Sequence, residues 1–72
     1  MHKPLSGKKV IRILCREFRF FVVSQKGSHV KLTARESGAT TIVPLHKELA
    51  LGTLKGVLEL AQVDNREFWK KL

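Results

Sequence analysis

The stretch RFFVVSQKGSHVKLTARESGATTIVPL, residues 19–45, decides the fold of this chain. It contains three short runs rich in aromatic and β-branched residues, and the segments KGS and ESG separate them. Short runs of this kind joined by glycine-containing turns predict a three-stranded antiparallel meander. Pro44 is expected to end the third strand or to lie at the sheet edge, because proline cannot donate a ladder hydrogen bond.

The second run alternates apolar and polar residues. Val30, Leu32 and Ala34 are expected to point to one face of the sheet, because successive strand residues face opposite sides. An alternation of this kind predicts one face packed on the core and one face open to water. His29 and Lys31 would then share the open face.

Helices are predicted before and after these three strands in the sequence. Ser6 can cap the first helix, whose apolar face carries Val10, Ile11, Leu14 and Phe18. Thr53 is expected to cap a second helix, with Gly52 as a position of close backbone approach. The apolar face of this helix carries Leu54, Val57, Leu58 and Ala61. Asp64 can cap a short last helix, NREFWKKL.

The predicted fold class is therefore α+β, in the order α-β-β-β-α with a short C-terminal helix. An open antiparallel sheet with both helices on one face would bury the apolar stripes. The 72 residues leave room for one domain. We expect it to span residues 1–72, with residues 1–5 as a short N-terminal tail. A homodimer or a bound partner would add stability to so small a core.

Positive charge is concentrated in the first half of the chain. The chain has 14 Lys and Arg against 6 Asp and Glu, a formal net charge of +8. Residues 1–35 hold nine of the basic side chains and a single acid, Glu17. The spacing predicts a basic stripe along the first helix, formed by Lys8, Arg12, Arg16 and Arg19. A solvated face would usually mix signs, so the stripe favours an anionic partner such as RNA.

Several classes of protein are excluded or disfavoured. The single cysteine, Cys15, cannot close an intramolecular disulfide, and the sequence has no spaced Cys/His framework for a metal. No P-loop or dinucleotide fingerprint is present, so no cofactor is expected. The apolar runs are far shorter than the roughly 20 residues that span a bilayer. No signal-peptide core is visible, and a cytoplasmic location is expected.

Histidine is the natural candidate for proton transfer at neutral pH. The chain has His2, His29 and His46. His2 lies in the N-terminal tail and is set aside. His46 follows the third strand, where a histidine that only shapes the loop is the plainer interpretation.

His29 has neighbours in the sequence that could bind a phosphate group. Gly27 would let a ligand approach the backbone closely, and Ser28 can donate to a phosphate oxygen. Lys26 and Lys31 can offset phosphate charge. These residue types could form a site that binds and cleaves a phosphodiester. The same spacing would also arise if Gly27 were a simple turn glycine and His29 an ordinary strand residue.

The remaining candidates are expected to be structural. Cys15, next to Leu14, is expected to be buried rather than nucleophilic. The aromatic residues are expected in the core rather than stacked on bases; they are Phe18, Phe20, Phe21, Phe68 and Trp69. Phe20 and Phe21 must point to opposite sheet faces, so at most one of the pair is exposed.

Taken together, several segments resemble the HicA family of toxin-antitoxin mRNA interferases over residues 5–70. They are LSGKKVIRIL, VVSQKGSHVKL, TIVPLHKELALGTLKGVLELAQV and REFWKKL. The resemblance implies a small toxin with a fold like that of double-stranded-RNA-binding domains, which cleaves mRNA and is held inactive by a HicB antitoxin. It also implies that Gly27 and Ser28 form the turn that presents the site, and that His29 is the catalytic histidine.

A metal-independent endoribonuclease can let the RNA 2′-hydroxyl attack the adjacent phosphate, which requires a base, an acid and cations. We hypothesise that His29 fills one proton-transfer role and that Lys26 or Lys31 stabilises the phosphorane. The second role is open among His46, water and the substrate. The basic stripe on the first helix is expected to hold RNA phosphates, with binding that weakens steeply as salt rises.

Two other functions remain open at this point. A non-catalytic RNA-binding module would use the same basic surface with His29 as a contact only. A structural or interaction protein would need His29 for neither binding nor turnover.

Overall fold

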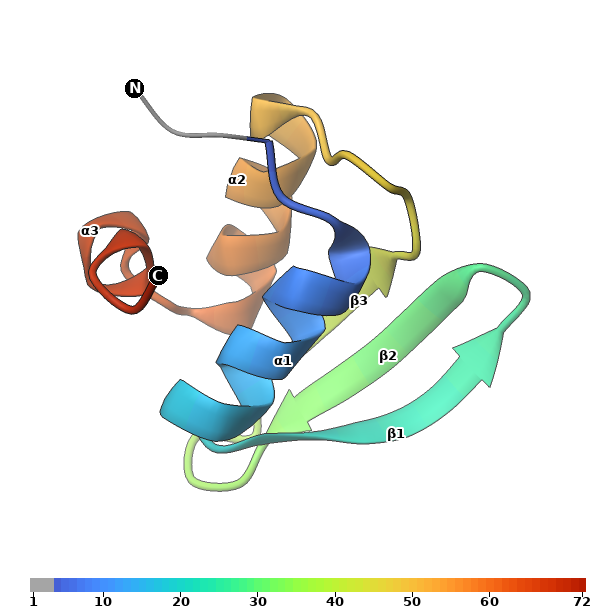
Figure 1. Cartoon of the computed structure of the whole chain (residues 1–72). Helices are drawn as coiled ribbons and strands as arrows, with labels where there is room; N and C mark the ends of the chain where they lie inside the picture. The colour runs from blue at the N-terminus through green and yellow to red at the C-terminus, as the bar shows by residue number, and fades with distance from the viewer. Residues whose placement is uncertain (1–3) are drawn as a thin grey trace.

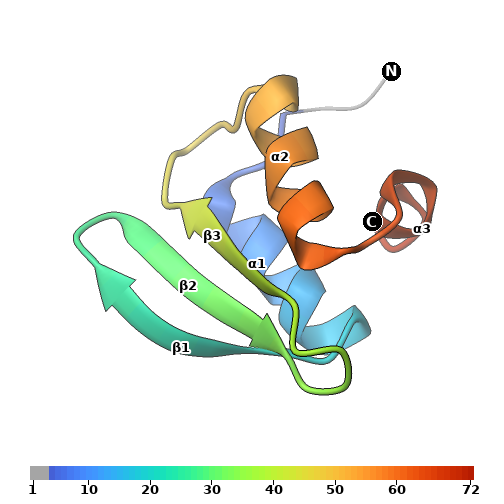
Figure 2. The same cartoon turned by 180° about the vertical axis from the view of Figure 1, so that it is seen from behind.

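The computed structural model describes residues 4–72, so His2 lies outside the described residues. The elements in chain order are α1 (Gly7–Glu17), β1 (Phe20–Lys26), β2 (His29–Ala34), β3 (Thr40–Pro44), α2 (Leu51–Ala61) and α3 (Asn65–Trp69). The strands form one antiparallel sheet in the order β1-β2-β3. Helix α1 lies in front of the sheet in Figure 1 and behind it in Figure 2. The predicted α+β fold with a three-stranded antiparallel sheet is confirmed.

The hairpin between β1 and β2 closes through a two-residue turn, Gly27 and Ser28. Gly27 has a φ of +60°, a left-handed conformation that glycine adopts without steric cost. A glycine at the first of two turn residues, followed by a residue with negative φ, is typical of a type II′ hairpin turn. The turn end of this hairpin extends past the helices (Figure 1).

A β-bulge at Val23 shifts the register of β1. Val22 pairs with Leu32 and Ser24 pairs with Lys31, so Val23 is the extra residue. Because side chains alternate between faces, the extra residue exchanges the faces of everything that follows it in β1. Ser24 therefore lies on the same face as Lys31.

The core lies between the sheet and the helices. Its fully buried apolar side chains include Val10, Leu14, Leu32, Val43, Leu58 and Phe68. Ile13 is also buried, although the sequence pattern placed only its neighbours on the apolar face. Thr41 is the buried polar residue of the described chain, and its hydroxyl donates to the Val57 carbonyl at 2.7 Å. This bond satisfies the hydroxyl and joins β3 to α2.

Helix α1 begins as predicted and ends earlier than predicted. The Ser6 hydroxyl accepts a hydrogen bond from the Lys9 backbone N–H at 3.0 Å, which confirms Ser6 as the N-cap. The helix stops at Glu17, and Arg19 has a φ of +61° outside it. The prediction that Arg19 lies on the helix is therefore wrong: a left-handed residue turns the chain from α1 into β1.

Close backbone approach occurs at Gly7 and not at Gly52. A Cβ atom on Gly7 would collide with the Pro44 carbonyl oxygen, and the Gly7 N–H donates to the His46 carbonyl at 2.9 Å. A Cβ on Gly52 would meet nothing within 4 Å. The start of α1 is thus packed directly on the end of β3.

The predicted start of α2 is also wrong. Its N-cap is Ala50 rather than Thr53, and Gly52 and Thr53 lie in its first turn. Leu49 is buried, and its N–H donates to the Leu5 carbonyl at 2.7 Å. This contact with a distant segment fixes the chain before Ala50, so the helix starts earlier than local capping preference indicates.

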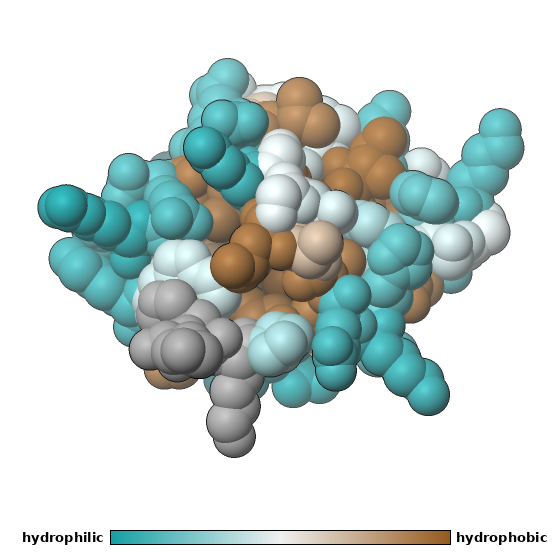
Figure 3. All heavy atoms as spheres, turned by 90° about the horizontal axis from the view of Figure 1, so that it is seen from above, coloured by the Kyte–Doolittle hydropathy of each residue, from teal (hydrophilic) through white to brown (hydrophobic). Residues whose placement is uncertain are grey.

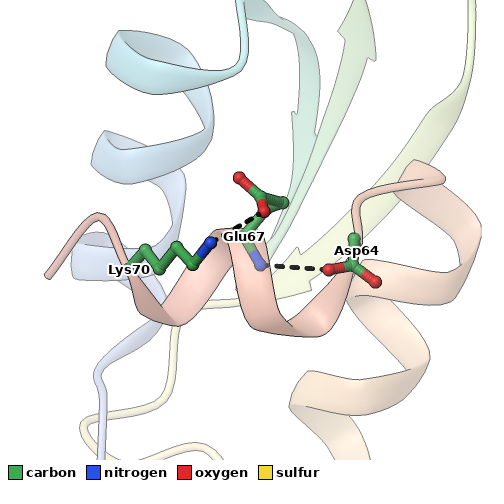
Figure 4. Close-up of polar contacts among 3 residues, drawn as sticks. All are labelled: Asp64, Glu67 and Lys70. Atoms are coloured by element: carbon green, nitrogen blue, oxygen red, sulfur yellow. Dashed lines mark hydrogen bonds and ion pairs between the residues drawn. The ribbon is translucent and has the colours of Figure 1, made fainter.

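The last helix, α3, starts as predicted. The Asp64 carboxylate accepts a hydrogen bond from the Glu67 N–H at 3.2 Å, and the Lys70 ammonium contacts the Glu67 carboxylate at 3.2 Å (Figure 4). Phe68 from this helix is fully buried and stacks near Phe18. Of the helices in residues 4–72, none is long and apolar enough to cross a membrane.

Candidate functional site

A groove with a volume of about 410 Å³ lies on the open face of the sheet. Its lining residues come from all three strands and are Ser24, Lys26, His29, Lys31 and Ile42. The register explains why they meet. His29 is paired with Lys26 on β1, and Lys31 is paired with Ser24 on β1 and Ile42 on β3. The expectation that His29 and Lys31 share the open face is confirmed.

His29 therefore has a cationic neighbour in two directions. Lys26 lies directly across the strand pair, where Cβ atoms are about 5 Å apart. Lys31 lies two residues along β2, and residues i and i+2 of a strand share a face. Both lysines and His29 are solvent-exposed. The arrangement offers one imidazole and two ammonium groups to an anion on the open face.

The turn that carries this end of the hairpin is held on two sides. The Gln25 side-chain amide donates to the Gly27 carbonyl at 3.0 Å. The Leu45 N–H donates to the Ser28 carbonyl at 2.7 Å, which ties the turn to the segment after β3. His29, the next residue, is therefore presented from a constrained backbone.

Two serines of this hairpin differ in their position relative to the groove. Ser28 is exposed in the turn and does not line the groove, whereas Ser24 does. No sequence pattern indicates Ser24, because only the bulge at Val23 brings it to the open face. Gly27 acts in the hairpin as a turn glycine, and no atom lies within 4 Å of a Cβ built on it.

His46 follows β3 in the loop that leads to α2. Its side chain is exposed in the loop between β3 and α2, and it is not among the lining residues. Its carbonyl accepts the hydrogen bond from Gly7. The backbone of His46 thus helps to join the loop to α1, through a contact that does not involve the imidazole.

The basic stripe and the groove belong to opposite layers of the molecule. Lys8, Arg12 and Arg16 are exposed on α1, which packs on the core face of the sheet and not on the open face. Arg19, off the helix, pairs with Glu36 at 3.5 Å. This ion pair is exposed and contributes little stability. The structure does not bring the stripe to His29.

Cys15 is half-buried, as expected for a structural cysteine. Burial raises the pKa of its thiol above the usual value, which disfavours the reactive thiolate at neutral pH. Within residues 4–72, no three His, Cys, Asp or Glu side chains come together as a candidate metal site.

Four of the five aromatic side chains pack in or against the core, as expected. Phe20 and Phe68 are buried, and Phe18 and Trp69 are partly buried against the same cluster. Phe21 differs, because it is 38% exposed on the open face. The Arg35 guanidinium lies 4.9 Å from the centre of its ring.

A larger groove, about 640 Å³, lies between α2 and α3. It is lined by Leu51, Leu54, Lys55, Asn65, Arg66, Trp69 and Lys70, with no histidine among them. Apolar side chains are also exposed where α2 begins, and Figure 3 shows apolar atoms in the middle of this end of the molecule with hydrophilic atoms around them. Proton-transfer chemistry is better served by the groove around His29.

Comparison with known families gives a match to a family model. A family model described as HicA toxin of bacterial toxin-antitoxin matches residues 7–63 of the 72 residues. The matched segment runs from the first residue of α1 to just past α2 and includes every residue of the open-face groove. No curated protein matches the chain.

Proposed function

Because the chain belongs to the HicA toxin family of bacterial toxin-antitoxin systems, we propose that it is an endoribonuclease that cleaves mRNA in the groove around His29. The observation that carries this proposal is the grouping of one imidazole with two lysines on an open sheet face. An open cationic face is accessible to a polyanion, and an imidazole adds proton transfer to binding.

The chemistry requires few groups. The RNA 2′-oxygen attacks the adjacent phosphorus, the 2′-hydroxyl proton leaves to a base, and the bond to the departing 5′-oxygen breaks as that oxygen gains a proton. His29 carries out one of these proton transfers, a role that contributes about 10²- to 10⁴-fold in rate. Lys26 and Lys31 stabilise the negative charge that grows on the phosphorane oxygens. The Ser24 hydroxyl can donate to a phosphate oxygen beside them.

The second proton transfer falls to water in this proposal. Of the five residues that line the groove, His29 is the one with an imidazole, and His46 is outside the lining. An enzyme with a single positioned proton-transfer group lacks the further rate gain that a second one would supply. The proposal therefore implies a slow nuclease, and we propose that it acts without a metal.

The stripe of Lys8, Arg12 and Arg16 binds RNA phosphates away from the cut. Because α1 lies on the other side of the sheet from His29, these side chains act on flanking RNA and not on the scissile phosphate. Their contribution is electrostatic and insensitive to sequence, and salt weakens it.

The protein partner of the proposal is a HicB-type antitoxin, which is expected to cover the groove and to present acidic side chains to the lysines. Adding the purified antitoxin to a cleavage reaction should then reduce the rate in step with its concentration. Cleavage that continues unchanged with the antitoxin in excess would contradict this part of the proposal.

The nuclease proposal is tested with a fluorescent single-stranded RNA in buffer containing EDTA, following cleavage and binding together. We expect His29→Ala to lose roughly 100-fold or more in cleavage and to keep its affinity. His46→Ala is the matched control, and it should cut like the wild type.

The other functions predict different outcomes. A non-catalytic RNA-binding module would bind without cutting in both the wild type and His29→Ala. A structural or interaction protein would neither bind nor cut. Either result contradicts the proposal.

A further inference from the structure

Phe21 is exposed where its neighbour is not. Phe20 is 4% exposed and faces the core, whereas Phe21 is 38% exposed and is paired with Thr33 on the open face. The exposed part of the Phe21 ring forgoes the free energy that its burial would provide. Phe21 therefore lies outside the hydrophobic core.

Arg35 lies against this ring. Its guanidinium carbon is 4.9 Å from the Phe21 ring centre, within the range of a cation–π contact. The Arg35 N–H donates to the Arg19 carbonyl at 3.0 Å, so the backbone just past β2 is fixed. The cation lies over one face of the aromatic ring, so the two groups together form one positively charged aromatic surface.

This surface shares a face with the groove. Phe21 is paired with Thr33, four residues from His29 on β2, a distance of roughly 13 Å along a strand. Thr33 is the cross-strand partner of Phe21, and its hydroxyl lies 3.0 Å from the Thr40 hydroxyl on β3. Among the described residues, no acidic residue of β1 or β2 lies on the same face as His29. A single polyanion can therefore run from Phe21 to His29.

We propose that Phe21 and Arg35 form a nucleobase-binding subsite for single-stranded RNA, which fixes the position of the strand relative to His29. The ligand is inferred from the pairing of flat and charged groups. Unpaired bases stack on aromatic rings and on guanidinium planes, while phosphates bind lysine. A duplex keeps its bases stacked inside, so it cannot occupy this subsite.

This proposal rests on the proposed function only in taking His29 as the site of cleavage. RNA binding at the subsite can be measured without cleavage. The probe is a short single-stranded RNA with a 2′-deoxy nucleotide at the cut site, which removes the attacking hydroxyl. A series of these RNAs carries one abasic nucleotide at each successive position. We expect affinity to fall roughly tenfold when the abasic nucleotide lies at one position on a fixed side of the cut site.

Variants test whether this loss of RNA affinity arises at the subsite. Phe21→Leu keeps an apolar side chain and should remove the dependence on abasic position, whereas Phe21→Tyr keeps a ring and should retain it. Arg35→Lys keeps the charge without the plane and should weaken the dependence. Leu60→Ala is the control for the loss of an exposed apolar side chain elsewhere, because Leu60 is exposed on α2. Thermal unfolding should be the same in all four.

The outcomes separate this proposal from the nuclease proposal. A position-dependent loss that Phe21→Leu abolishes supports the subsite even if the wild type never cuts RNA, a result that would overturn the nuclease alone. A flat abasic series with an active wild type overturns the subsite alone. If Phe21→Leu weakens binding of the antitoxin and leaves RNA binding unchanged, the surface is a protein-binding one and the subsite is wrong.

Discussion

The two faces of one three-stranded sheet differ in almost every respect. On the face toward the helices, Leu32 and Val43 are completely buried. On the other face, neighbouring residues of the same strands are exposed, among them Lys31 and Ile42. The comparison shows that stability and the proposed chemistry are assigned to alternate residues of the same strands. Substitutions on one face should therefore change folding, and substitutions on the other should change function.

The largest expected effect is on the core face. Leu32→Ala removes a fully buried side chain and should lower the free energy of unfolding by about 3 kcal/mol. Lys31→Ala, one residue away, should change it by less than about 0.5 kcal/mol while reducing RNA cleavage. Urea unfolding and cleavage assays measure the two. Equal destabilisation by both variants would contradict the separation of the faces.

A smaller effect is expected where polar groups differ between the faces. Thr41→Val leaves the Val57 carbonyl without its buried donor and should cost about 1–2 kcal/mol of unfolding free energy. Thr33→Val removes a hydroxyl on the open face, whose Thr40 partner is only part-buried, and should cost less. The difference in urea midpoint between the two variants measures this; a larger cost for Thr33→Val would be the contrary result.

For cleavage, the sheet face on which a lysine lies should matter more than the total charge of the protein. Lys26→Gln should slow cleavage roughly tenfold by removing a charge beside the phosphate. Adding Gln25→Lys restores the net charge on the opposite face of β1, because Gln25 is paired with the core-facing Val30. We expect the double variant to remain as slow as Lys26→Gln. Full recovery would show that net charge alone matters, and Gln25→Lys alone is the control.

The stripe on α1 should govern affinity and leave the cut itself unchanged. Replacing Lys8, Arg12 and Arg16 with Gln should reduce the slope of log affinity against log salt by about 2, since single-stranded RNA contributes about 0.7 per neutralised phosphate. Fluorescence anisotropy at several salt concentrations measures the slope. An unchanged slope would remove these residues from the RNA interface.

The smallest expected effect concerns Cys15. Burial raises the pKa of its thiol, so the folded protein keeps the thiol proton to a higher pH than the unfolded chain does. The corresponding stability is present below the unfolded pKa and is lost as pH rises through the folded pKa. Alkylation by iodoacetamide should be slower in the folded protein than in guanidinium chloride at mildly alkaline pH. Equal rates would contradict the burial.

Local signals were enough to predict much of this fold. Ser6 and Asp64 cap their helices through contacts three residues away, a range that a sequence pattern covers. Alternation in β2 likewise predicted which side of the sheet His29 would occupy. The glycine-containing segment KGS predicted the hairpin turn beside it.

Features that depend on distant contacts were missed. The start of α2 is set by Leu49, whose backbone N–H donates a hydrogen bond to the carbonyl of the distant Leu5. The sequence around Thr53 does not indicate that contact. Ser24 reaches the groove only because Val23 is a bulge, and a bulge is a property of strand pairing. Helical spacing places Arg19 on the basic stripe of α1, but its left-handed backbone conformation puts it outside the helix.

The most direct test of the difference between the faces is the single-turnover cleavage rate at saturating RNA, measured for the wild type, His29→Ala and the variant lacking the three charges of α1. Saturation removes differences in affinity, so the rate reports the open face alone. We expect the rate to fall about 100-fold or more for His29→Ala and to stay within about twofold of the wild type for the α1 variant, whose charges act on flanking phosphates. A His29→Ala rate equal to the wild type, or an equal fall in both variants, would contradict the assignment of cleavage to the groove around His29.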